Sequence, residues 1–128
     1  MPSDLATVLV VEDEALIALD LQVLLEDAGY RVLGPANSSA MAFSLLETNQ
    51  PDVALLDINL GRTNAFDIAD RLATQNTKLI FLTGYTAQTL PPAHRNRPLV
   101  SKPYLPDMVL QAVGDALAIE TSAEETAV

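Results

Sequence analysis

The chain of 128 residues contains no cysteine and no tryptophan, and it has a single histidine. Without cysteine there is no disulfide framework, no zinc–thiolate site and no cysteine nucleophile. Basic residues are also scarce, because 7 lysines and arginines stand against 17 aspartates and glutamates, for a net charge of −10. Such an acidic surface repels nucleic-acid phosphates, so we expect no direct binding to DNA or RNA.

Long hydrophobic runs are absent as well, although hydrophobic residues make up 49% of the chain. No run is long enough to span a bilayer, and residues 1–4 lack the basic stretch that opens a secretory signal peptide. We therefore expect a cytoplasmic protein with no membrane partner. The length suits one domain, predicted over residues 1–121, followed by an acidic flexible tail over residues 122–128, where helical periodicity is lost.

Short apolar segments alternate with helical patterns along the chain. The apolar segments are rich in β-branched residues and predict strands buried on both faces, at about 5–11, 31–34, 53–56, 78–82 and 99–101. Between and after them, helices are predicted at about 15–28, 38–49, 65–74, 86–90 and from 106 through 117. This alternation predicts an α/β fold, a doubly wound flavodoxin-like (βα)5 sandwich with a parallel sheet in the order 2-1-3-4-5.

Several local signals mark the ends of these helices. The apolar residues Leu16, Leu19 and Val23 have helical spacing, and Gly29 is placed to end that helix. Either Asn37 or Ser38 can cap the second helix.

Polar side chains follow four of the five predicted strands. Glu12 and Asp13 follow the first, Asp57 the third, Thr83 the fourth and Lys102 the fifth. Each has an ordinary explanation when taken alone, such as acids near a helix N-terminus or a lysine reaching out from a strand end. However, ligands of open α/β sheets bind at the carboxyl ends of the strands, so these groups are expected to converge.

A converging set of this kind suits phosphoryl transfer. Three neighbouring carboxylates repel one another, and a hard divalent cation such as Mg²⁺ relieves the repulsion. The Asp57 carboxylate can act as a nucleophile and form an acyl phosphate. Lys102 and the Thr83 hydroxyl can then contact the oxygens of the transferred group.

These motifs, with their spacing, resemble the receiver domain of bacterial response regulators over about residues 6–119. The resemblance implies that Asp57 is the phosphoacceptor and that Thr83 is the switch hydroxyl. It also implies that the Lys102–Pro103 peptide bond is cis. The implied Mg²⁺ ligands are Glu12, Asp13, Asp57 and the backbone carbonyl of Asn59.

Two positions depart from the common pattern of this family. Residues 58–62 replace a frequent Met-Pro pair, and Val100 stands where many members have an aromatic residue. In contrast, residues 81–85 resemble the Phe-Ala-Thr-Gly-Tyr type known from single-domain regulators. Tyr85 is therefore expected to act with Thr83 as the switch. His94, between polar neighbours, is expected on a loop surface.

The resemblance implies a stand-alone receiver of a two-component phosphorelay. It would accept a phosphoryl group from a histidine kinase or phosphotransfer protein and signal to an unknown downstream protein. It would be no enzyme beyond its own phosphorylation and autodephosphorylation. One alternative is a small Mg²⁺-dependent phosphatase of the haloacid dehalogenase type. In such enzymes the nucleophilic Asp ends the first strand and a second Asp follows two residues later. Here Asp13 is followed by Glu14-Ala15, which does not match that pattern. Another is a degenerate receiver that binds a partner without phosphorylation, against which the complete set of site residues argues.

Overall fold

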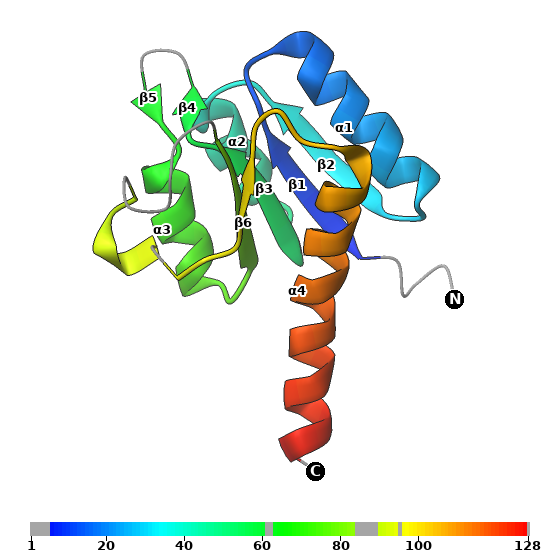
Figure 1. Cartoon of the computed structure of the whole chain (residues 1–128). Helices are drawn as coiled ribbons and strands as arrows, with labels where there is room; N and C mark the ends of the chain where they lie inside the picture. Colours follow the sequence, from blue (N-terminus) through cyan, green and yellow to red (C-terminus); the bar gives the residue numbers. More distant parts are fainter. Residues whose placement is uncertain (1–5, 61–62, 84–89, 95, 128) are drawn as a thin grey trace.

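The computed structural model describes residues 6–60, 63–83, 90–94 and 96–127, and side chains within these ranges except at 59–64 and 119–127. Five parallel strands form one sheet in the order β2-β1-β3-β6-β7, which confirms the predicted fold and strand order (Figure 1). These strands are β1 (Thr7–Val11), β2 (Arg31–Ala36), β3 (Val53–Asp57), β6 (Lys78–Thr83) and β7 (Leu99–Ser101).

Four α-helices cover the two faces of this sheet. They are α1 (Ala15–Asp27), α2 (Ser39–Leu46), α3 (Phe66–Thr74) and α4 (Pro106–Ala127), and a 3₁₀ turn, η3 (Pro92–His94), precedes β7. The alternation of side chains along a strand divides the core into two clusters. Val8 and Val10 of β1 pack with α1 and α4, whereas Leu9 and Val11 pack with α2 and α3.

The helix ends follow the local signals in the sequence. Gly29, just beyond α1, has φ +97°, a backbone region that glycine enters without steric cost. At the start of α2, the Ser38 hydroxyl accepts a hydrogen bond from the Met41 backbone N–H at 3.1 Å, so Ser38 is the residue that caps this helix.

The secondary structure differs from the prediction at two places and leaves a third predicted element untested. The last helix was expected to end before residue 122, but α4 continues to Ala127, through alanines and glutamates that favour helices. A short antiparallel pair, β4 (Asn59–Leu60) and β5 (Thr63–Asn64), was not predicted. The helix expected at 86–90 falls almost entirely outside the described residues, and the division of the chain at residue 121 stays a prediction.

The apolar periodicity of α1 predicted the helix but does not mark its buried face. Leu16, Leu19 and Val23 are 79%, 53% and 48% exposed, while the residues of α1 that enter the core are Ala18, Leu21 and Leu25. An apolar stripe therefore remains on the outer side of α1. None of the helices within the described ranges is long and apolar enough to cross a membrane.

Candidate functional site

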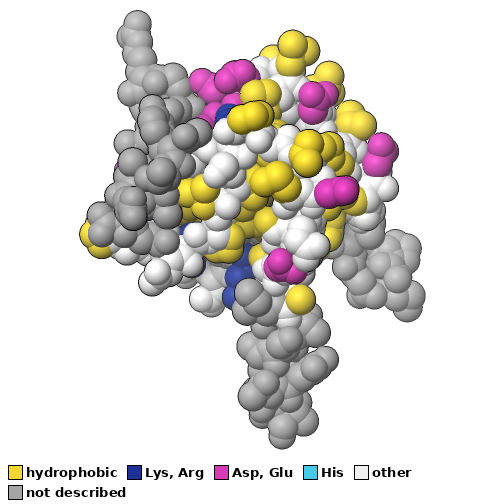
Figure 2. Space-filling view, viewed as in Figure 1, with side chains coloured by type: hydrophobic (Ala, Val, Ile, Leu, Met, Phe, Trp, Pro, Cys, Tyr) yellow, Lys and Arg dark blue, Asp and Glu magenta, His cyan; other side chains and the backbone are white. Residues whose placement is uncertain are grey.

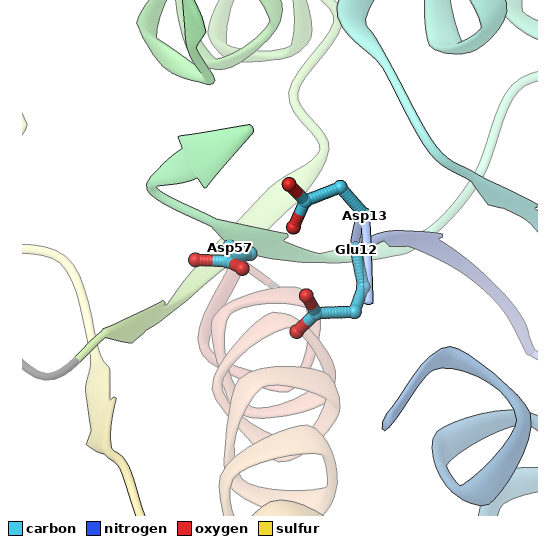
Figure 3. A group of neighbouring side chains, drawn as sticks. All are labelled: Glu12, Asp13 and Asp57. Atoms are coloured by element: carbon cyan, nitrogen blue, oxygen red, sulfur yellow. The ribbon is translucent and has the colours of Figure 1, made fainter. Parts of the chain in front are cut away.

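Three carboxylates meet at the carboxyl edge of the sheet. Glu12 and Asp13 directly follow β1, and Asp57 is the last residue of the adjacent strand β3. One oxygen from each lies within 4.8 Å of the others. Figure 3 shows the three side chains next to one another. Glu12 and Asp57 are buried, whereas Asp13 is exposed to solvent. The predicted convergence of these acids is thus present in the fold.

Lys102, which directly follows β7, brings a positive charge to the same place. Its ammonium donates hydrogen bonds to Glu12 Oε1 at 2.9 Å and to Asp57 Oδ2 at 3.1 Å. The Lys102–Pro103 peptide bond is cis, as the family resemblance implied. A single lysine therefore bridges two of the three acids.

Thr83 ends β6 beside this lysine. The residue is buried, and its backbone carbonyl accepts a hydrogen bond from the Lys102 backbone N–H at 2.8 Å. Asn59 begins β4 two residues after Asp57, and its role as a carbonyl ligand stays a prediction. Tyr85 falls outside the described residues, so the predicted switch role of this residue is not tested.

The electrostatics of the site follow from burial and from these contacts. Burial, together with the hydrogen bond to Asp57, raises the pKa of Glu12 to about 7, against the lowering effect of Lys102. For Lys102, burial lowers the pKa, but the hydrogen bonds to Glu12 and Asp57 outweigh it and raise the pKa above its usual value. Burial, and then the charge of Glu12, raises the pKa of Tyr104. Ionisation of these neighbouring carboxylates therefore costs free energy, and a bound cation can offset that cost.

The β7 residues that share a face with Thr83 are Leu99 and its direct partner Ser101, rather than Val100. β6 and β7 are parallel, with Phe81 opposite Leu99 and Leu82 opposite Val100. Leu99 packs with Phe81 in the core cluster beside α2 and α3, whereas Val100 belongs to the opposite cluster beside α1 and α4. A side chain at position 100 is therefore on the wrong face to follow a movement of Thr83.

His94 is not a surface residue, contrary to the expectation from the sequence. Only 2% of it is exposed, and its Nε2 forms a hydrogen bond with Asp70 Oδ1 at 2.8 Å. Its ring stacks on Phe66 at a centroid distance of 6.2 Å and meets Phe81 edge-on at 5.7 Å. The polar neighbours of His94 do not indicate this burial, because the aromatic rings and Asp70 come from distant segments.

Comparisons with known proteins agree with this fold and site. Residues 8–113 match the family model of the response regulator receiver domain. The chain is 35% identical to the phyllosphere-induced regulator PhyR of Methylorubrum extorquens, covering 96% of this chain and 48% of that protein. It is 33% identical to the transcriptional regulatory protein PdtaR of Mycobacterium tuberculosis over 65% of this chain and 41% of that one. The chain thus spans less than half the length of these relatives.

Solved structures give the same result. The response regulator PhyR from Brucella abortus superposes with a TM-score of 0.82 at 31% identity, over 96% of this chain and 52% of that one. A CheY-like receiver domain protein from Methanospirillum hungatei shares the fold, with a TM-score of 0.81 at 21% identity, over 94% and 99% of the two chains. The chain belongs to the response regulator receiver domain family.

Proposed function

We propose that this receiver domain accepts a phosphoryl group on Asp57 from a phosphohistidine protein. The contact of the Asp57 carboxylate with Lys102 at 3.1 Å, beside two further acids, carries the proposal. An Asp57 oxygen attacks phosphorus as the bond from phosphorus to the donor histidine breaks, which leaves an acyl phosphate. Hydrolysis by water later restores the carboxylate.

The donor set fits a magnesium ion. Oxygens of Glu12, Asp13 and Asp57 lie within 4.8 Å of one another, and Mg²⁺ prefers oxygen ligands from one or two carboxylates plus water. Asn59, two residues after Asp57, would add its backbone carbonyl. When bound, Mg²⁺ would neutralise charge on the phosphoryl oxygens and on the carboxylates that surround them.

Lys102 and Thr83 would contact the transferred group. The Lys102 ammonium already contacts Asp57, so it can neutralise a phosphoryl oxygen on that residue with little movement. Thr83 ends the strand beside Asp57, with Asp57 paired to Leu82, and its hydroxyl is suited to hydrogen-bond another oxygen. These groups make the domain a catalyst of its own phosphorylation and autodephosphorylation only.

An apolar groove beside this site suits the phosphohistidine donor. It has a volume of about 860 Å³ and runs between α1 and the segment after β7; its lining includes Val23, Leu24, Lys102 and Tyr104. Asp20 and Asp27 also line it, and Figure 2 shows acidic and apolar side chains interspersed on this face. A second copy of this acidic chain would be repelled, so we propose that a donor helix with an apolar stripe and flanking basic residues docks here.

Incubation with acetyl phosphate and Mg²⁺, followed by intact mass measurement, tests the phosphoacceptor. Wild type is expected to gain one phosphoryl group that is labile to base, while Asp57→Asn, which keeps the shape and loses the nucleophile, gains none. A base-labile phosphoryl group on the Asp57→Asn chain would show that another residue is the acceptor. Turnover of simple phosphomonoesters by the wild type would favour the phosphatase alternative instead.

A further inference from the structure

The strand pairing of β1 and β2 is interrupted next to the acidic site. Thr7, Val8 and Leu9 pair in sequence with Arg31, Val32 and Leu33, but Val11 pairs with Ala36. One residue, Val10, therefore lies opposite two residues of β2, Gly34 and Pro35. This arrangement is a β-bulge, a feature that bends a strand and changes where its pairing ends.

Gly34 allows this bulge because no side chain fits at its position. Its φ is +95°, and a Cβ atom built on it would lie 2.7 Å from the Ala36 nitrogen and 3.1 Å from the Val10 carbonyl oxygen. Both contacts are with backbone atoms, which cannot swing aside as a flexible side chain can. An alanine at this position must therefore displace Ala36, Val10 or both.

Ala36 and Val10 are both connected to Glu12. The Ala36 carbonyl accepts a hydrogen bond from the Glu12 backbone N–H at 2.9 Å, and Val10 precedes Glu12 by two residues on the same strand. The Glu12 carboxylate is held in turn by Lys102 at 2.9 Å and by the Glu14 backbone N–H at 3.2 Å. The bulge thus fixes the backbone position of Glu12, the first residue of the acid cluster.

We infer that Gly34 is a positioning residue for the acidic site: the bulge that it permits sets Glu12 and Asp13 at the distance from Asp57 that a divalent cation needs. Gly34 has no side chain, so in this inference it acts through the backbone of Val10, Ala36 and Glu12. The inference rests on the magnesium site proposed above. Metal affinity depends on residues that orient the ligands, and altering them typically costs ten- to a hundred-fold.

Gly34→Ala tests the inference, and Gly29→Ala is its matched control. Gly29 has nearly the same φ, +97°, but a Cβ there would meet nothing within 4 Å. The control thus carries the cost of the backbone conformation without the collision. Mg²⁺ binding is measured by isothermal calorimetry on the full chain. Gly34→Ala is expected to weaken Mg²⁺ binding by about tenfold or more, and Gly29→Ala by less than about twofold. Equal Mg²⁺ affinity of Gly34→Ala and wild type would overturn the inference and leave the metal site standing.

If Gly34→Ala does not fold, as judged by far-ultraviolet circular dichroism, hydrogen exchange of the wild type decides the question. Mg²⁺ is expected to slow exchange of the Glu12 amide, whose bond to Ala36 the bulge supports, and to leave the Gly29 amide unchanged. An unchanged exchange rate at Glu12 would overturn the inference. A wild-type chain that binds no Mg²⁺ would overturn the metal site itself, and this inference with it.

Discussion

Asp70 of α3 and His94 of the turn before β7 form a hydrogen bond of 2.8 Å between an exposed and a buried side chain. The Asp70 side chain is 71% exposed and the His94 side chain 3%. The histidine lies inside, between Phe66 and Phe81, and reaches outward to the carboxylate. The Nδ1 atom of the same ring is buried with no hydrogen-bond partner among the described residues. Within the described part of the chain, Asp70 therefore supplies the one polar contact of this ring.

Asp70→Ala is expected to lower the free energy of unfolding by about 1 kcal/mol, because it removes the partner of a buried polar atom. Asp20→Ala removes an exposed aspartate from the middle of α1 and is the control, with an expected loss under about 0.5 kcal/mol. Urea unfolding followed by circular dichroism measures both. Equal losses in the two variants would mean that the bond to His94 contributes nothing.

Much of the site could be predicted because parallel strands place their carboxyl ends at one edge. The positions of Glu12, Asp57 and Lys102 follow from that rule alone, whatever their distance in sequence. The burial of His94 could not be predicted, since it depends on packing between segments that meet only after folding. The bulge at Gly34 was also not predicted, because a glycine before a proline is as typical of the end of a strand as of a bulge.

The raised pKa of Glu12 makes the stability of the metal-free chain depend on pH. The pKa is about 7 in the folded chain, against the ordinary value of 4.5, so between these values the folded chain binds more protons than the unfolded chain. The free energy of unfolding should therefore fall as pH rises from about 4.5 to 7 and should level off above. In EDTA, Glu12→Gln is expected to remove this contribution, and Glu47→Gln, at an exposed position, to retain it. A stability difference between wild type and Glu12→Gln that stays constant over this range would contradict the prediction.

Asp13→Asn is expected to weaken Mg²⁺ binding by about tenfold or more, since it removes a charged oxygen ligand. The free energy of unfolding in EDTA should be unchanged or slightly higher, because a negative charge near Asp57 is lost. Glu14→Gln removes the same charge at the next position, outside the cluster, and serves as the control. Calorimetric titration that gives Asp13→Asn the wild-type affinity would remove Asp13 from the site.

Substitutions in the groove beside α1 are expected to slow phosphoryl transfer from a protein donor but not from acetyl phosphate. Replacing Leu19 and Val23, two exposed residues that line the groove, together by serine should slow transfer from a phosphohistidine protein that phosphorylates the wild type, by about tenfold. Labelling by acetyl phosphate should be unchanged, because Asp57 and Lys102 are untouched. Met41→Ser removes a similarly exposed apolar side chain from α2 and should leave both rates as they are. Equal slowing with both donors would show that the substitutions act on the site rather than on docking.

Tyr85, outside the described residues, remains the predicted reporter of phosphorylation. Beryllofluoride, which mimics the phosphoryl group, is expected to change the aromatic NMR signals of Tyr85 and the amide signals near Thr83. Leu99 lies on the Thr83 face of β7 and gives an internal comparison, while Val100 lies on the other face. Large changes confined to Leu99 and Val100, with Tyr85 silent, would contradict the assignment.

The burial of His94 has a practical consequence for following phosphoryl flow. It is the only histidine of the chain, and its ring is closed off by Phe66, Phe81 and Asp70, so it offers no nitrogen to a phosphoryl donor. In a mixture with a phosphohistidine partner, every phosphoramidate therefore belongs to the partner and every acyl phosphate on this chain to a carboxylate. Lability to alkali alone then separates the two pools, so donor depletion and receiver gain can be timed in one tube without separating the proteins.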